Sequence, residues 1–114
     1  MNWAMIGAAL AALAVACGAF GSHGLADAPQ KAQQWWEIAA RYHFFHALAL
    51  FAWGLAGRRG AAPWLWLAGT LLFSGTLYLL AVAGWRPHPL LTPLGGFLMI
   101  GGWLAAAGAL WRKR

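Results

Sequence analysis

The sequence predicts an all-α membrane protein, built as an antiparallel bundle of four transmembrane helices. Two observations support this fold class. Hydrophobic residues make up 62% of the 114 residues and charged residues only 9%, whereas a soluble domain carries about 25% charge. The apolar residues also gather into four stretches, separated by short breaks rich in Gly, Pro and Arg. This composition excludes a disordered chain, and the single Cys excludes a disulfide-stapled secreted domain or a conventional zinc module.

The predicted spans each approach the ~20 apolar residues that a helix needs to cross the hydrocarbon core. In chain order they cover residues 3–25, 36–56, 62–83 and 90–111, with breaks at 27–29, 57–60 and 84–89. Loops this short join antiparallel neighbours. Residues 1–114 are therefore expected to form one membrane domain, without an extramembrane part of any size.

The first stretch is predicted to be a transmembrane helix rather than a cleaved signal peptide, because it lacks a basic start and is too long for a signal's apolar core. The second stretch is the most polar. Asp27 and Gln30 have the spacing of a capping box, so the helix is expected to begin there and to extend roughly two turns beyond the membrane core. Glu37 and Arg41 are four residues apart with the acid first, which predicts an interfacial ion pair on one helix face.

Small residues at helical spacing line one face of the first and last stretches, and such faces let helices pack closely in a bilayer. They are Gly7, Ala11 and Gly18 in the first stretch, and Gly101, Ala105 and Ala109 in the last, with Gly102 and Ala106 beside them. We expect these faces to pack inside the bundle. Contact with a second copy of the chain, as a homo-oligomer, is the alternative.

The basic residues predict the orientation of the helices. Arg58, Arg59 and residues 112–114 share one side of the membrane with the N-terminus, whereas Lys31 and Arg86 lie on the other side. The positive-inside rule puts the side with more basic residues, and thus both termini, in the cytoplasm. The net charge of +6 is explained by this topology. Because the basic residues form no continuous face, no nucleic-acid partner is expected.

With this topology every His, both carboxylates, both Tyr, Arg41 and Arg86 are expected in the outer half of the bundle. Polar groups inside a bilayer face other helices, where they find partners. The candidate polar inter-helix site therefore consists of His23, Tyr42, His46, Ser74 and Tyr78. No catalytic residue is predicted, because no Ser-His-acid arrangement is evident.

Two hypotheses compete for this site. In the first, its side chains form hydrogen bonds between helices and fix their register, at about 0.6 kcal/mol for each pair. In the second, His23, His43 and His46 are candidate ligands of a metal, haem or quinone. The first hypothesis is preferred, because the two carboxylates do not lie on the required helix face, and no cofactor is assigned.

Four ordered motifs resemble one known family. They are GAFGSHGL at 18–25, YHFFHALAL at 42–50, Ser74-Gly75 with Tyr78, and TPLGG at 92–96 followed by Gly102-Trp103. In these motifs the chain is similar to the domain-of-unknown-function 423 family, small inner-membrane proteins that resemble the vertebrate transmembrane protein 256 group. The resemblance implies a multi-pass protein of the bacterial plasma membrane and no established activity. It also implies that the five residues of the candidate polar site are motif positions.

The expected function is that of a non-enzymatic, structural or accessory membrane protein with a polar site near the outer leaflet. Its expected partners are the lipid bilayer and either another membrane protein or a second copy of itself. The alternative is a redox or ligand-binding role in which His23 and His46 hold a metal, haem or quinone. A transporter or channel is disfavoured, because four short spans with few ionisable residues line only a narrow path.

Overall fold

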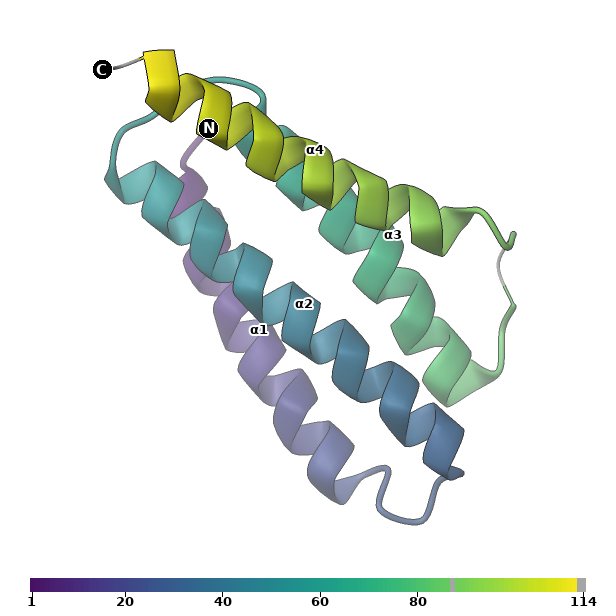
Figure 1. Ribbon diagram of the computed structural model, residues 1–114. Helices are drawn as coiled ribbons and strands as arrows, with labels where there is room; N and C mark the ends of the chain where they lie inside the picture. The colour runs from purple at the N-terminus through teal and green to yellow at the C-terminus, as the bar shows by residue number, and fades with distance from the viewer. Residues whose placement is uncertain (87, 113–114) are drawn as a thin grey trace.

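The computed structural model describes residues 1–86 and 88–112, and these residues form four α-helices. The helices are α1 (Trp3–His23), α2 (Gln30–Leu55), α3 (Ala62–Ala83) and α4 (Leu91–Arg112). Successive helices run in opposite directions, so that both ends of the chain lie at the same end of the molecule (Figure 1). The fold measures 50 × 27 × 20 Å. The basic residues at 113–114 and the proline of the third predicted break lie outside the described residues.

The helices pack as a row, with α1 against α2, α2 against α3 and α3 against α4. Figure 1 shows α1 and α4 on opposite sides of this row. The fold is thus two antiparallel hairpins that meet through α2 and α3. The hydrophobic core lies toward the end that holds both termini and draws on all four helices. It consists of Trp3, Leu50, Trp53, Ala62, Trp66 and Ala106.

Three of the helices are long and apolar enough to cross a membrane. These are α1, α3 and α4, whose most apolar windows have mean hydropathies of 2.0, 1.8 and 1.5. The helix α2 is not among them, because polar and charged residues occupy much of its first half. The hydropathy of the described residues therefore supports three of the four predicted spans.

Glycines allow the paired helices to approach until their backbones touch. A Cβ on Gly7 in α1 would overlap the backbone of Phe51 in α2, and a Cβ on Gly95 in α4 would overlap the backbone of Phe73 in α3. Any other residue at these positions would push the helices apart. Close packing of this kind is the main attraction between helices in a bilayer, where lipid tails are as apolar as the side chains.

The small residues at these contacts differ in part from the predicted faces. On α4, Gly102 and Ala106 are buried as part of the predicted set, and Gly95, which was not in that set, is buried as well. Gly101 is only half-buried. On α1, a Cβ at Gly18 would meet nothing within 4 Å. The predicted faces therefore lie partly at the edge of the contacts, because spacing identifies a face of small residues without identifying its neighbour.

The start of α2 also differs from its prediction. The helix begins at Gln30, preceded by Pro29, and no side chain caps its first turn. The predicted capping box of Asp27 with Gln30 is therefore wrong. Instead, the side-chain Nε2 of Gln33 donates a hydrogen bond of 2.9 Å to the carbonyl oxygen of Leu25. This amide satisfies a carbonyl left open after α1 ends, and it closes the turn between the two helices.

Candidate functional site

The buried polar side chains of this protein gather along α2 and α3. Among the described residues they are His43, His46, Thr70, Ser74 and Thr76. A polar group taken out of water needs a hydrogen-bonding partner, and a hydrocarbon environment offers none. The hydrogen-bonding partners of these five side chains therefore show whether the cluster joins helices or is open to a ligand.

His46 uses both of its ring nitrogens inside the protein. Its Nδ1 lies 2.7 Å from the carbonyl oxygen of Tyr42, and because a carbonyl only accepts, Nδ1 carries a hydrogen and donates it. Its Nε2 accepts a hydrogen bond of 3.1 Å from the indole Nε1 of Trp103 in α4. These partners assign a neutral imidazole, which has no lone pair left for a metal ion. His46 thus joins α2 to α4.

His43 joins α2 to α3. Its Nδ1 lies 2.9 Å from the hydroxyl oxygen of Tyr78, and the centres of the two rings are 5.9 Å apart. The other ring nitrogen, Nε2, is buried without a hydrogen bond of good geometry, and the backbone of Leu10 in α1 lies near the ring. The side chain of Cys17 in α1 lies near the same hydroxyl. His43 and Tyr78 therefore lie where α1, α2 and α3 meet.

Two further hydrogen bonds, both to backbone carbonyl oxygens, join α2 to its neighbours. The hydroxyl of Ser74 in α3 donates to the carbonyl oxygen of Ala39 over 2.8 Å. The indole Nε1 of Trp36 donates to the carbonyl oxygen of Cys17 in α1 over 2.6 Å. Together with the histidines, these bonds connect α2 to each of the other three helices. Hydrogen bonds between helices in membranes average about 0.6 kcal/mol and reach about 1.7 kcal/mol, so the set favours one register.

The structure brings three of the five predicted site residues to this cluster, namely His46, Ser74 and Tyr78. Tyr42 lies at the margin of the buried face of α2 and is 40% exposed, so that only its backbone carbonyl takes part. His23 is the exposed last residue of α1. The side chains of Tyr42 and His23 are not part of the cluster. The rotation of 100° per residue predicts the helix face on which a side chain lies. It does not predict whether that side chain lies inside the contact with the next helix or at its edge.

Trp36, His43 and Trp103 make hydrogen bonds that the sequence analysis did not assign. An indole N–H only donates, and one in the middle of an apolar helix needs an acceptor. Trp103 stands in the middle of α4, so its N–H needs an acceptor from another helix. The identity of each acceptor depends on which helices are neighbours, and helical spacing does not contain that information.

The candidate metal ligands His23, His43 and His46 do not converge. His43 and His46 bond to Tyr78 and Trp103, which belong to different helices. Among residues 1–86 and 88–112, no group of three or more His, Cys, Asp or Glu side chains could hold a metal ion. The hydrogen bonds of His43 and His46 instead join α2 to α3 and to α4.

The Glu37–Arg41 pair lies outside this cluster, on an exposed side of α2. Its Nη2 and Oε1 atoms are 3.0 Å apart. The two side chains are more than half exposed, so the pair takes no part in the buried contacts between α2 and its neighbours.

Comparison with known proteins identifies relatives of this chain. The family described as protein of unknown function (DUF423) matches residues 17–96. The chain is 42% identical over 108 residues to the UPF0382 membrane protein YwdK of Bacillus subtilis (strain 168), covering 88% of each chain. It is 36% identical over 108 residues to the UPF0382 inner membrane protein YgdD of Escherichia coli (strain K12), covering 88% of this chain and 82% of that one. No solved structure matches the chain significantly.

Proposed function

This chain belongs to the DUF423 family of membrane proteins, and we propose that it acts as a non-enzymatic, structural or accessory protein of the bacterial plasma membrane. In this proposal the polar side chains along α2 hold four spanning helices in one register. The observation that carries it is that His46 satisfies both ring nitrogens inside the protein, on Tyr42 and Trp103. A histidine in this state stabilises packing and offers no lone pair to a ligand.

We infer that α2 crosses the membrane together with the other three helices. It has 26 residues, a length of about 39 Å, which exceeds the hydrocarbon core of about 30 Å. The bond from Trp36 to the carbonyl of Cys17 and the close approach at Gly7 hold α2 along α1, which is apolar enough to span. The polar first turns of α2 are expected to project beyond the core.

The basic residues support an orientation with both termini in the cytoplasm. Arg58, Arg59 and Arg112 belong to the end of the fold that holds the termini, whereas Lys31 and Arg86 belong to the other end. Short loops on the cytoplasmic side carry the excess of Lys and Arg in membrane proteins. The printed name of the Escherichia coli relative, an inner membrane protein, supports the same membrane for this chain.

Single-cysteine variants on a Cys17→Ala background test this topology in spheroplasts. Asp27→Cys is expected to react with a membrane-impermeant maleimide from outside, and Arg59→Cys only after lysis, because a spanning α2 separates the two positions by the full bilayer. His88→Cys is the matched control for the outer side. Labelling of Asp27→Cys and Arg59→Cys from the same side would contradict a membrane-spanning α2.

Ligand binding by histidine is the second candidate function. One observation favours it: the buried Nε2 of His43 has no hydrogen bond of good geometry. A metal, haem or quinone bound there would need further ligands or contacts from other residues. Because His46 is fully bonded, His43 is the histidine on which this candidate depends.

The purified full-length protein is expected to be colourless and to carry no stoichiometric metal, because its buried histidines act through hydrogen bonds. Absorption spectra and elemental analysis of the wild type and His43→Gln measure this. His23→Gln, which changes an exposed histidine, is the matched control. A chromophore or metal that is present in the wild type and the control, but absent from His43→Gln, would contradict the structural role and support the second candidate.

A further inference from the structure

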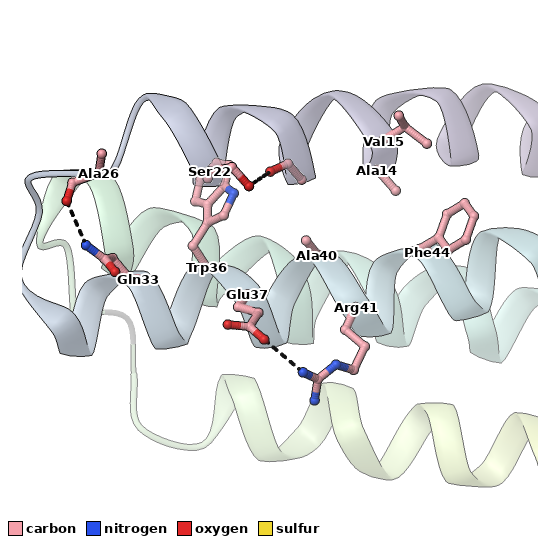
Figure 2. A pocket seen from close by; sticks show the side chains of 12 residues that line it. Ala14, Val15, Ser22, Ala26, Gln33, Trp36, Glu37, Ala40, Arg41 and Phe44 are labelled. Carbon is pink, nitrogen blue, oxygen red and sulfur yellow. Dashed lines mark hydrogen bonds and ion pairs between the residues drawn. The ribbon is translucent and has the colours of Figure 1, made fainter.

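A groove of about 560 Å³ lies between α1 and α2, outside the buried polar cluster. Apolar side chains of both helices line it, and a linked pair of charged side chains also borders it. In the view of Figure 2 this pair extends from the side of α2 away from α1. The apolar residues include Ala14, Val15, Ala40 and Phe44, and the charged pair is Glu37 and Arg41. Gly18 also lines the groove, and the space where its side chain would stand has no heavy atom within 4 Å. The groove is therefore hollow partly because this position lacks a side chain.

The charged pair at the rim has unused hydrogen-bonding capacity. One bond joins Nη2 of Arg41 to Oε1 of Glu37, and the side chains are 52% and 71% exposed. Within the described part of the chain these side chains make no other hydrogen bond. The guanidinium therefore keeps free N–H donors, and the carboxylate keeps a free acceptor oxygen.

The packing of α1 against α2 sets the depth of this pair. Gly7 touches the backbone of Phe51, and because the helices are antiparallel, Arg41 lies close to the level of Cys17. Cys17 precedes the end of α1 at His23 by six residues, which is about 9 Å along the helix. Where α1 spans the membrane, the charged rim therefore lies within the outer part of the span rather than in bulk water.

Charged side chains at such a depth are unfavourable unless charges and hydrogen bonds compensate them. Arg41 reaches back toward Glu37, and thus toward the nearer membrane surface, as long basic side chains do. An adjacent cation and anion complement a ligand that carries a phosphate next to an ammonium group. The ammonium must bear hydrogens in order to donate to the carboxylate of Glu37, which a quaternary ammonium cannot do.

We propose that this groove binds one phospholipid with a phosphoethanolamine head group. The phosphate accepts hydrogen bonds from Arg41, the primary ammonium donates to Glu37, and one acyl chain lies along Val15, Gly18 and Phe44. The groove volume falls in the range of about 300–1,000 Å³ that is usual for small-ligand sites. The proposal goes beyond the structural role and rests on α1 and α2 both lying in the membrane.

A second copy of the chain fits this groove less well than a lipid does. Two copies related by a two-fold axis present the same surface to each other. If that axis passes through the groove, one hollow lies against the other and both stay unfilled. A single acyl chain fills the hollow and leaves the charged rim to the head group.

Native mass spectrometry of the full-length protein tests the proposal, with phosphatidylethanolamine, phosphatidylcholine and phosphatidylglycerol of identical acyl chains supplied in equal amounts. One phosphatidylethanolamine per chain is expected, bound about tenfold more tightly than phosphatidylcholine. Arg41→Gln removes the phosphate partner, and Gly18→Leu adds a side chain to the groove at a position where a Cβ meets no heavy atom within 4 Å. Each is expected to weaken phosphatidylethanolamine binding about tenfold.

Lys31→Gln is the matched control, because Lys31 is an exposed cation on the same helix that lies over the ring of Trp35. It is expected to bind as the wild type does, and circular dichroism checks that each variant is folded. Equal binding of the three lipids, or unchanged lipid binding by folded Gly18→Leu, would overturn the proposal. A lipid-free dimer that Gly18→Leu abolishes would overturn it in favour of a second copy.

Discussion

Gly95→Ala is expected to destabilise the folded protein by about 1–3 kcal/mol, although alanine is the better helix former by about 1 kcal/mol. A Cβ at this position overlaps the backbone nitrogen of Phe73 in α3. Backbone atoms cannot turn aside as the end of a side chain can, so α3 and α4 must separate. The separation removes van der Waals packing, which is the main attraction between helices in lipid.

Unfolding in mixed micelles at increasing SDS, followed by tryptophan fluorescence, measures this change. Gly75→Ala in α3 is the matched control, since its new Cβ meets nothing within 4 Å. The control is expected to leave stability unchanged or to raise it by up to about 1 kcal/mol. An equal loss in both variants would contradict the packing argument, because it would reflect the replacement of a helical glycine rather than the contact at Gly95.

His46→Ala is the second substitution with a large expected effect, a loss of about 2–4 kcal/mol in the free energy of unfolding. It removes a ring that is only 4% exposed and opens a cavity between α2 and α4. It also leaves the indole N–H of Trp103 without its acceptor. An unpaired donor in apolar surroundings adds the penalty of its lost hydration to the lost packing.

The same micelle unfolding experiment checks this prediction. His23→Ala is the control, because His23 is exposed, and it is expected to change stability by less than about 0.5 kcal/mol. A double-mutant cycle of His46→Ala with Trp103→Phe isolates their hydrogen bond, for which a coupling of about 0.6–1.7 kcal/mol is expected. A coupling near zero would show that this bond does not hold α4 to α2.

The helices themselves could be predicted closely from the positions of apolar residues and breaks. The range 62–83 coincides with α3, and the first and last predicted ranges end within two residues of α1 and α4. For α2 only the apolar span differs: the helix begins at Gln30, near the start expected at Asp27 but six residues before the span. The span was defined by apolar residues, whereas a helix continues through Gln, Lys and Glu, which are good helix formers wherever water or lipid head groups solvate them.

The sequence predicted a polar site between helices, but not all of the residues that form it. His46, Ser74 and Tyr78 were identified because polar groups in an apolar helix need partners, and the structure shows those partners. The side chain of Tyr42 instead lies 40% exposed, at the edge of the contact. His43, one residue and about 100° further round the helix, bonds to Tyr78. The rotation of α2 against α3 therefore decides which of these two neighbouring side chains makes the contact.

Composition was enough to identify a helical membrane protein, because so many apolar side chains cannot be covered in water and because a helix satisfies its own backbone in lipid. Composition does not predict which side chains form hydrogen bonds with one another. His46 and Trp103 are 57 positions apart, and no local rule connects them. Their meeting depends on where α4 lies relative to α2, and the packing of all four helices decides that position. Hydrogen bonds act over about 3 Å, so the site exists only once that position is set.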